Sequence, residues 1–456
     1  MKRTYLTYLT FACMLGTFTA CTQREMPETG GTAGAEESAV QRIGIQLASD
    51  NGNDGLARAG RPLYSNQPAQ MVDKVVLVIC DNENKVVVRK LVDNWETVSE
   101  VYETSGHGRK AVIELNGKEH LPATVGHYTL YAIGYTSRES NQTAYTVTTS
   151  ASGSKNLDEY FSELTIGDVF APNLVLHLDG APGEEIFAGS VSFTTFASGG
   201  FDQTVVLNRQ VAGTYVYVED VPYVEGASVL RLTASADNDG LVLGEFANEN
   251  IAENGQGTGK YVMNGTSPTS SGAPYTVCEI DLSQWMSDGQ IRQDGTLVSV
   301  DNRQIPSQYK EKKATFKEGS FYSGSFLIPF AAVSDQQSLT LGLYKKDAAT
   351  AVKTWKVSLS QSDVNKQTGV IWHWDSSRSQ FQDPSGAASV AESKESYSVL
   401  RNHLYCIGRK DKDGSSDKDE PQALEDVTEL IIRVIADWDM VYDMILEPKP
   451  ETGTGN

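Results

Sequence analysis

Two strand-like runs near the C-terminus read Tyr397-Ser-Val-Leu-Arg-Asn-His-Leu-Tyr-Cys-Ile-Gly408 and Leu430-Ile-Ile-Arg-Val-Ile-Ala-Asp-Trp-Asp-Met-Val-Tyr-Asp-Met-Ile-Leu446, with a charged loop between them. In the second run every other residue is apolar over Leu430, Ile432, Val434, Ala436 and Trp438. A period of two with β-branched and aromatic residues predicts a strand with one apolar face. A strand in this position can pair within its own sheet or complete the sheet of another molecule.

The rest of the chain repeats the strand pattern. Lys74–Cys80 and Lys85–Val92 flank a polar turn and predict a hairpin. Similar short runs continue to Val370–Trp374, whereas Leu157–Phe170 is the one credible helix. Strands at this spacing predict β-sandwiches. We therefore expect an all-β chain with at most one or two short helices.

Length and charge limit the class of protein. The chain has 456 residues, 39% of them hydrophobic, which is enough for two or three domains with packed cores. The formal net charge of −21 repels nucleic acid and anionic membranes, so direct binding to either is not expected.

The N-terminus has the order of an export signal. A basic start, Met1-Lys-Arg3, precedes an apolar stretch, Thr4–Thr19, that is too short to span a bilayer. Ala20-Cys21 then looks like a lipobox, in which residues 1–20 are removed and Cys21 is lipidated. Phe18 stands where the usual leucine would be, and an ordinary signal peptide is the alternative. The polar residues 21–38 read as a flexible tether.

The first predicted strand is followed by a loop with two arginines. Ile43, Ile45 and Leu47 alternate with other residues and form its apolar face. The loop then reaches Leu56-Ala-Arg-Ala-Gly-Arg61, where Arg58, Ala59 and Arg61 offer a small, flexible target for an arginine-specific protease. An ordinary surface loop is the alternative interpretation.

Two motifs carry a resemblance to a known family. Leu400-Arg-Asn-His-Leu-Tyr405, followed by a loop and a strand pair with Asp437-Trp438, resembles the C-terminal region of the fimbrillins, the FimA- and Mfa-type pilus subunits of anaerobic Gram-negative bacteria. A second motif resembles the junction between the two fimbrillin domains, and its residues are Leu207, Arg209, Val211 and Ala212. The resemblance implies two tandem transthyretin-like or Greek-key β-sandwich domains, residues 39–210 and 211–456.

The resemblance also implies a mechanism of assembly. Cleavage near Arg58 or Arg61 would remove the strand Ile43–Leu47 and open a groove. The C-terminal strand of a neighbouring subunit, with Leu430, Ile432, Val434, Ala436 and Trp438 as donor residues, would fill it. The expected partners are other fimbrial subunits, the outer membrane through the lipid on Cys21, and a host protein or glycan. Stalk, tip and anchor roles stay open, and a stalk is favoured because it needs both a cleavage site and a donor.

No catalytic residue, metal site or cofactor is expected. Asn254–Tyr261 lacks the spacing of a phosphate loop, and Arg409–Glu420 has Arg409 where a calcium loop begins with Asp, so a solvated linker is favoured over calcium binding. Cys80, Cys278 and Cys406 are expected to be buried apolar residues.

The second class of function is a surface lipoprotein that binds glycan or host protein through the loops 245–273 and 375–396. Exposed aromatic side chains at Trp285, Trp355 or Trp372 would support it.

Overall fold

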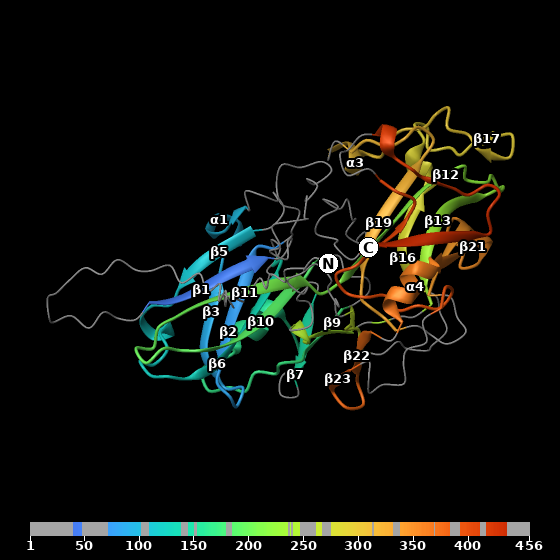
Figure 1. Cartoon of the computed structure of the whole chain (residues 1–456). Helices are drawn as coiled ribbons and strands as arrows, with labels where there is room; N and C mark the ends of the chain where they lie inside the picture. The colour runs from blue at the N-terminus through green and yellow to red at the C-terminus, as the bar shows by residue number, and fades with distance from the viewer. Residues whose placement is uncertain are drawn as a thin grey trace, which may run out of the picture. The chain divides into compact units, whose positions relative to one another are not determined.

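The all-β prediction is confirmed by a computed structural model (Figure 1). The structure describes residues 40–47, 72–101, 109–137, 145–149, 153–178, 185–235, 238, 240–246, 261–266, 275–311, 314–331, 338–368, 370–383, 393–410 and 416–435.

The first large sheet has eight strands in the order β3-β2-β6-β10-β11-β1-β5-β4. Their bounds are β1 (Gln41–Leu47), β2 (Lys74–Cys80), β3 (Val86–Val92), β4 (Glu100–Val101), β5 (Arg109–Glu114), β6 (His127–Tyr135), β10 (Phe187–Thr194) and β11 (Phe201–Arg209). Side chains from strands that are far apart in this order share one core, since Ile45 of β1 clusters with Leu77 of β2 and Val88 of β3. The sheet therefore folds over on itself, as a sandwich does.

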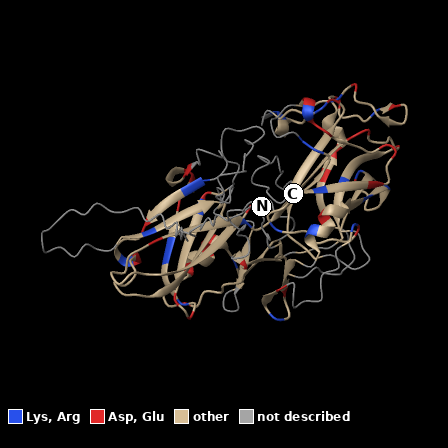
Figure 2. Ribbon diagram, viewed as in Figure 1, with Lys and Arg blue, Asp and Glu red and all other residues tan. Residues whose placement is uncertain are grey.

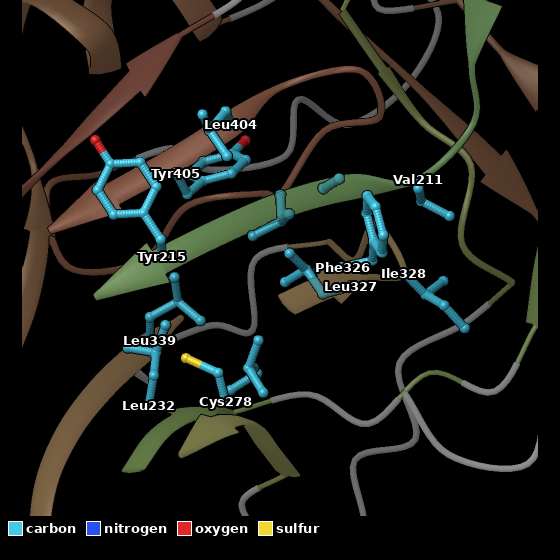
Figure 3. Packing of buried hydrophobic residues seen from close by; sticks show 14 of the residues in the cluster. Val211, Tyr215, Leu232, Cys278, Phe326, Leu327, Ile328, Leu339, Leu404 and Tyr405 are labelled. Carbon is cyan, nitrogen blue, oxygen red and sulfur yellow. The ribbon is translucent and has the colours of Figure 1, made fainter. Parts of the chain in front are cut away.

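The second large sheet has nine strands, ordered β16-β13-β20-β21-β26-β24-β12-β19, with β25 paired to β12 off this path. Their bounds are β12 (Ala212–Glu219), β13 (Ala227–Ala234), β16 (Tyr275–Asp281), β19 (Phe321–Leu327), β20 (Leu339–Lys345), β21 (Ala351–Leu359), β24 (Leu404–Ile407), β25 (Gln422–Ala423) and β26 (Glu429–Ile435). Figure 3 shows Tyr215 of β12 beside Leu404 and Tyr405 of β24 in the core of this sheet.

Three smaller sheets complete the strands. One has the order β14-β9-β7-β8, the second β15-β22-β23, and the third β17-β18. Their bounds are β7 (Thr146–Thr149), β8 (Gly153–Asn156), β9 (Leu174–His177), β14 (Gly240–Leu243), β15 (Tyr261–Met263), β17 (Gln293–Asp294), β18 (Leu297–Val298), β22 (Ile371–Asp375) and β23 (Gln380–Gln382). β15 and β23 lie inside the two stretches expected to be long loops. β14 pairs with β9, so a strand from beyond Gln210 extends a sheet of the first half. The domain boundary near Gln210 stays a prediction.

The helices differ from expectation. The described residues hold four short α-helices, α1 (Trp95–Val98), α2 (Leu157–Glu163), α3 (Ser307–Glu311) and α4 (Gln361–Gln367), where at most two were expected. α1 and α3 are too short to give a helical hydrophobic period, and α4 has Val364 as its one buried apolar residue.

α2 ends at Glu163, seven residues before the predicted end at Phe170. The Asp168 carboxylate accepts hydrogen bonds from the backbone and hydroxyl of Thr165 at 2.8 and 2.9 Å, which forms a turn. Those bonds compete with continuation of the helix.

The three cysteines behave as predicted. Cys80, Cys278 and Cys406 are free thiols and all are buried. Figure 3 shows Cys278 among Leu232 and Leu339. Burial raises the pKa of Cys80 to about 12 and also raises the pKa of Cys406, so these thiols stay protonated at neutral pH.

In the described part of the chain, acidic and basic residues are scattered over many elements, and most of each strand is neither acidic nor basic (Figure 2). Among the described residues, no helix is long and apolar enough to cross a membrane.

Candidate functional site

The first strand occupies an interior position of its sheet (Figure 1). β1 pairs in parallel with β11, with Ile45 opposite Val205, and antiparallel with β5, with Ile45 opposite Ala111. Its backbone therefore satisfies hydrogen-bonding groups on two neighbouring strands. Without β1, both strands would face each other across an open groove.

The inward face of β1 is fully buried. Ile43, Ile45 and Leu47 have exposed fractions of 0%, 1% and 0%. The predicted alternation is therefore confirmed, and each side chain contributes roughly 1.5–3 kcal/mol by its burial. On the outward face, Arg42 pairs with Glu114 at 3.1 Å and with Asp202 at 3.6 Å.

A polar contact holds the beginning of β1. The side-chain nitrogen of Gln41 donates to the carbonyls of Leu121 and Gly199 at 2.9 and 2.8 Å. The backbone N–H of Leu121 donates back to the Gln41 side-chain oxygen at 2.7 Å. Gln41 is 1% exposed, so all of these bonds are shielded from water. Sequence reasoning missed Gln41, although it lies in phase with Ile43, Ile45 and Leu47.

The predicted donor strand is built into its own sheet. β26 pairs in parallel with β21, where Ile432 lies opposite Leu359, and antiparallel with β24, where Val434 lies opposite Tyr405. Leu430 and Ile432 are 1% and 0% exposed, whereas Ile431 on the other face is 48% exposed. The alternating face is confirmed for these residues. Ala436 and Trp438 lie outside the described residues, as do Cys21, Arg58, Ala59 and Arg61.

The two motifs that carry the family resemblance meet inside the molecule. Arg401, which is 2% exposed, donates from Nη1 to the side-chain oxygen of Gln210 at 3.0 Å and to the carbonyl of Gly244 at 2.6 Å. Its Nη2 donates to the carbonyl of Glu245 at 3.0 Å. Gln210 follows β11 directly, so Arg401 joins the junction segment to the chain after β14.

Tyr405 stabilises the turn in the same motif. Its hydroxyl accepts a hydrogen bond from the backbone N–H of Leu400 at 2.9 Å. A second buried pair flanks Gln210, where Arg209 bonds to Glu185 at 2.5 Å and packs over the ring of Phe187. These contacts give the polar residues of both motifs buried hydrogen-bond partners.

The described part of the 409–420 stretch is solvated at Arg409, Asp417, Lys418 and Glu420, as expected of a linker, but not at Lys410 and Asp419. Arg409 and Glu420 form an isolated β-bridge, and the Lys410 ammonium lies 2.7 Å from both oxygens of Asp419. Lys410 and Asp419 are buried, and the Tyr217 hydroxyl donates to Asp419 at 2.7 Å. Residues 411–415 lie outside the described residues. The same holds for residues 254–260 of the stretch Asn254–Tyr261 that was compared with a phosphate loop.

The aromatic residues considered for glycan binding have different environments. Trp285 and Trp355 are 2% and 0% exposed, and the Trp355 indole donates to the carbonyl of Leu424 at 3.1 Å. Trp372 on β22 is half-buried. Within the described ranges, no group of three or more His, Cys, Asp or Glu residues could hold a metal ion.

No protein-family model and no curated protein matches the sequence. Among solved structures, the chain is similar to a putative adhesin from Bacteroides thetaiotaomicron, at 12% identity and a TM-score of 0.37, covering 87% of this chain and 95% of that one. It is also similar to the tip fimbrial protein Mfa3 from Porphyromonas gingivalis, at 11% identity and a TM-score of 0.36, covering 87% and 99%. A third similar structure is the fimbrial anchor protein Mfa2 from the same organism, at 10% identity and a TM-score of 0.32, covering 69% of this chain and 81% of that one.

Proposed function

We propose that this protein is a structural subunit of a cell-surface fimbrium that assembles by strand exchange and supports cell adhesion. The observation that supports this most directly is the place of β1. It fills the interior of a sheet and buries three aliphatic side chains, yet its link to β2 runs through residues 48–71, which include Arg58 and Arg61.

Cleavage in this link would change how β1 is held. Before the cut, β1 is tied to its sheet covalently and refills its groove at once. After the cut, only hydrogen bonds and burial retain it, and a strand from another subunit can compete for the same backbone groups. The incoming strand would recover the burial of Ile43, Ile45 and Leu47, and this makes the exchange energetically feasible.

Within the predicted donor strand, we propose that the residues after Ile435 are the part that enters the neighbouring subunit. Withdrawal of β26 would break its pairing with both β21 and β24 and would expose Leu430 and Ile432. The sequence that follows alternates again, with apolar residues at Trp438, Met440, Tyr442, Met444 and Leu446. This segment can serve as a donor while β26 stays paired with β21 and β24 and anchors the segment to the molecule.

The precursor is proposed to reach the outer membrane as a lipoprotein through Cys21. A stalk role fits a chain with both a cleavable link and a donor segment, because an anchor keeps its lipid and a tip needs no donor.

The test is treatment of the full-length Cys21→Ala protein with an arginine-specific protease. We expect N-terminal sequencing to place the new terminus after Arg58 or Arg61, and ladders of stable multimers to form on gels. The matched control is Arg58→Lys/Arg61→Lys, which keeps the charge and should stay monomeric. Monomeric protein after complete cleavage would contradict strand exchange. A mature surface protein that begins at Cys21 would indicate an anchor instead. Incorporation of labelled fatty acid into the wild type and not into Cys21→Ala tests the lipid.

A further inference from the structure

The groove under β1 has a polar end that is built by other parts of the chain. The Leu121 N–H and the Leu121 and Gly199 carbonyls converge on the Gln41 carboxamide. These groups belong to the 121–126 loop and to the turn before β11, and neither is part of β1.

Contacts independent of β1 hold this polar end in shape. Thr195 donates from its hydroxyl to the Thr124 carbonyl at 2.7 Å and accepts from the Gly126 N–H at 2.8 Å. Gly199 has φ +81, and a Cβ there would lie 2.6 Å from the Pro122 carbonyl, so the turn and the loop are in close contact. The polar end therefore persists when β1 leaves.

A strand that replaces β1 must satisfy one buried donor and two buried acceptors at this position. Only a carboxamide offers two N–H donors and an oxygen acceptor together. A carboxylate cannot donate, an indole cannot accept, and an aliphatic side chain does neither. Unsatisfied buried groups of this kind are strongly disfavoured.

The C-terminal segment of this chain lacks the required residue. No Asn or Gln occurs between Gln422 and Asn456. Thr428 precedes Leu430, Ile432 and Val434 at the matching distance, and Ala436 precedes Trp438, Met440 and Tyr442 at the same distance in the later alternation. None of these side chains can replace the carboxamide.

The C-terminal segment of a second copy fills the groove in multimers of the isolated protein, where no other strand competes for it. We infer that the groove binds more tightly a strand from a different protein. That strand carries Gln or Asn, followed by aliphatic residues two, four and six positions later, and runs parallel to β11. The inference rests on the proposed strand exchange and makes this subunit an acceptor for another type of subunit.

The test uses labelled peptides added to the full-length chain after cleavage with the arginine-specific protease. The four probes are the native sequence of residues 39–49, its Gln41→Met form, its Gln46→Met form, and residues 434–446. Gln46 lies on the opposite face of β1, which makes Gln46→Met the matched control. We expect the native and Gln46→Met peptides to bind equally, and Gln41→Met and the 434–446 peptide to bind at least about tenfold more weakly.

The outcomes separate the two proposals. If the native peptide does not enter the cleaved protein, strand exchange itself fails and the inference falls with it. If the native and Gln41→Met peptides bind equally, or if the 434–446 peptide binds as well as the native peptide, strand exchange still stands. The inference that the incoming strand needs a carboxamide at the position of Gln41 (the carboxamide rule) is then overturned. A second measurement needs no exchange, because Gln41→Met in the intact chain should lower Tm by clearly more than Gln46→Met. Equal Tm values would also overturn the rule.

Discussion

The Nη1 of Arg401 donates a hydrogen bond to the side-chain oxygen of Gln210 at 3.0 Å across a sequence separation of 191 residues. One residue belongs to the motif Leu400–Tyr405 and the other lies between Arg209 and Val211 in the junction motif. The two stretches that looked unrelated in sequence are thus the two sides of one buried contact.

Arg401→Met should destabilise the protein by about 3 kcal/mol, since it leaves the Gln210 oxygen and the Gly244 and Glu245 carbonyls without their donor. Urea unfolding measures this change. Arg292→Met is the control, because Arg292 is half-exposed and its ion pair with Asp288 has the i,i+4 surface geometry that contributes little. Equal stability of the two variants would contradict the assigned role.

Lys410→Met should be more damaging than the double change Lys410→Met/Asp419→Leu. The single change leaves a buried carboxylate without its cation, at a cost of about 3–5 kcal/mol. The double change removes both charges, so it should recover part of this loss in a double-mutant cycle. An additive cycle would show that the two side chains do not act as a pair.

Three changes to aspartate distinguish β26 from the segment that follows it. Ile432→Asp should lower the unfolding free energy by roughly 3 kcal/mol or more, because it places a carboxylate at a fully buried position. Ile431→Asp should be close to neutral, since Ile431 is on the exposed face. Trp438→Asp should keep the Tm of the monomer and abolish the multimer ladder. Loss of ladders in Ile431→Asp, or retention in Trp438→Asp, would place the donor elsewhere.

The stability of the protein should fall as pH rises from about 9 toward 12. The pKa of Cys80 is raised to about 12 by burial, from an unperturbed value of 9.0. In this window the unfolded chain has lost the thiol proton and the folded chain retains it, so ionisation favours unfolding. The slope of the unfolding free energy against pH should be shallower in Cys80→Ala. An unchanged slope would contradict the raised pKa.

Thiol modification checks the same burial without a mutation. Cys80, Cys278 and Cys406 should resist iodoacetamide at pH 8 in the folded protein and react fully in urea, as followed by peptide mass mapping.

The sequence allowed the strands to be predicted where side chains alternate regularly. Ile43, Ile45 and Leu47 and the pair Leu430 and Ile432 have the predicted burial. The C-terminal end of α2 was misjudged because Thr165 and Asp168 form a local turn whose hydrogen bonds leave no mark on hydrophobic periodicity.

The contacts of Gln41 and of Arg401 could not be predicted for a different reason. Their partners lie at Leu121, Gly199 and Gln210, far away in sequence, and a lone polar residue does not identify a distant partner. The pairing of β26 with both β21 and β24 is likewise a matter of topology, which the alternation of one strand does not determine.

The pairing of β14 with β9 has a consequence for the order in which the chain can mature during synthesis. Gly240–Leu243 emerges from the ribosome long after Leu174–His177, so a nascent chain that ends near Gln210 has a bare β9 edge. Such an edge readily recruits the wrong strand, and the first half is safest when it folds only after residue 243 has been made. Under the export proposed above, this favours delivery across the membrane as one unfolded chain, in which β9 and β14 pair on the far side.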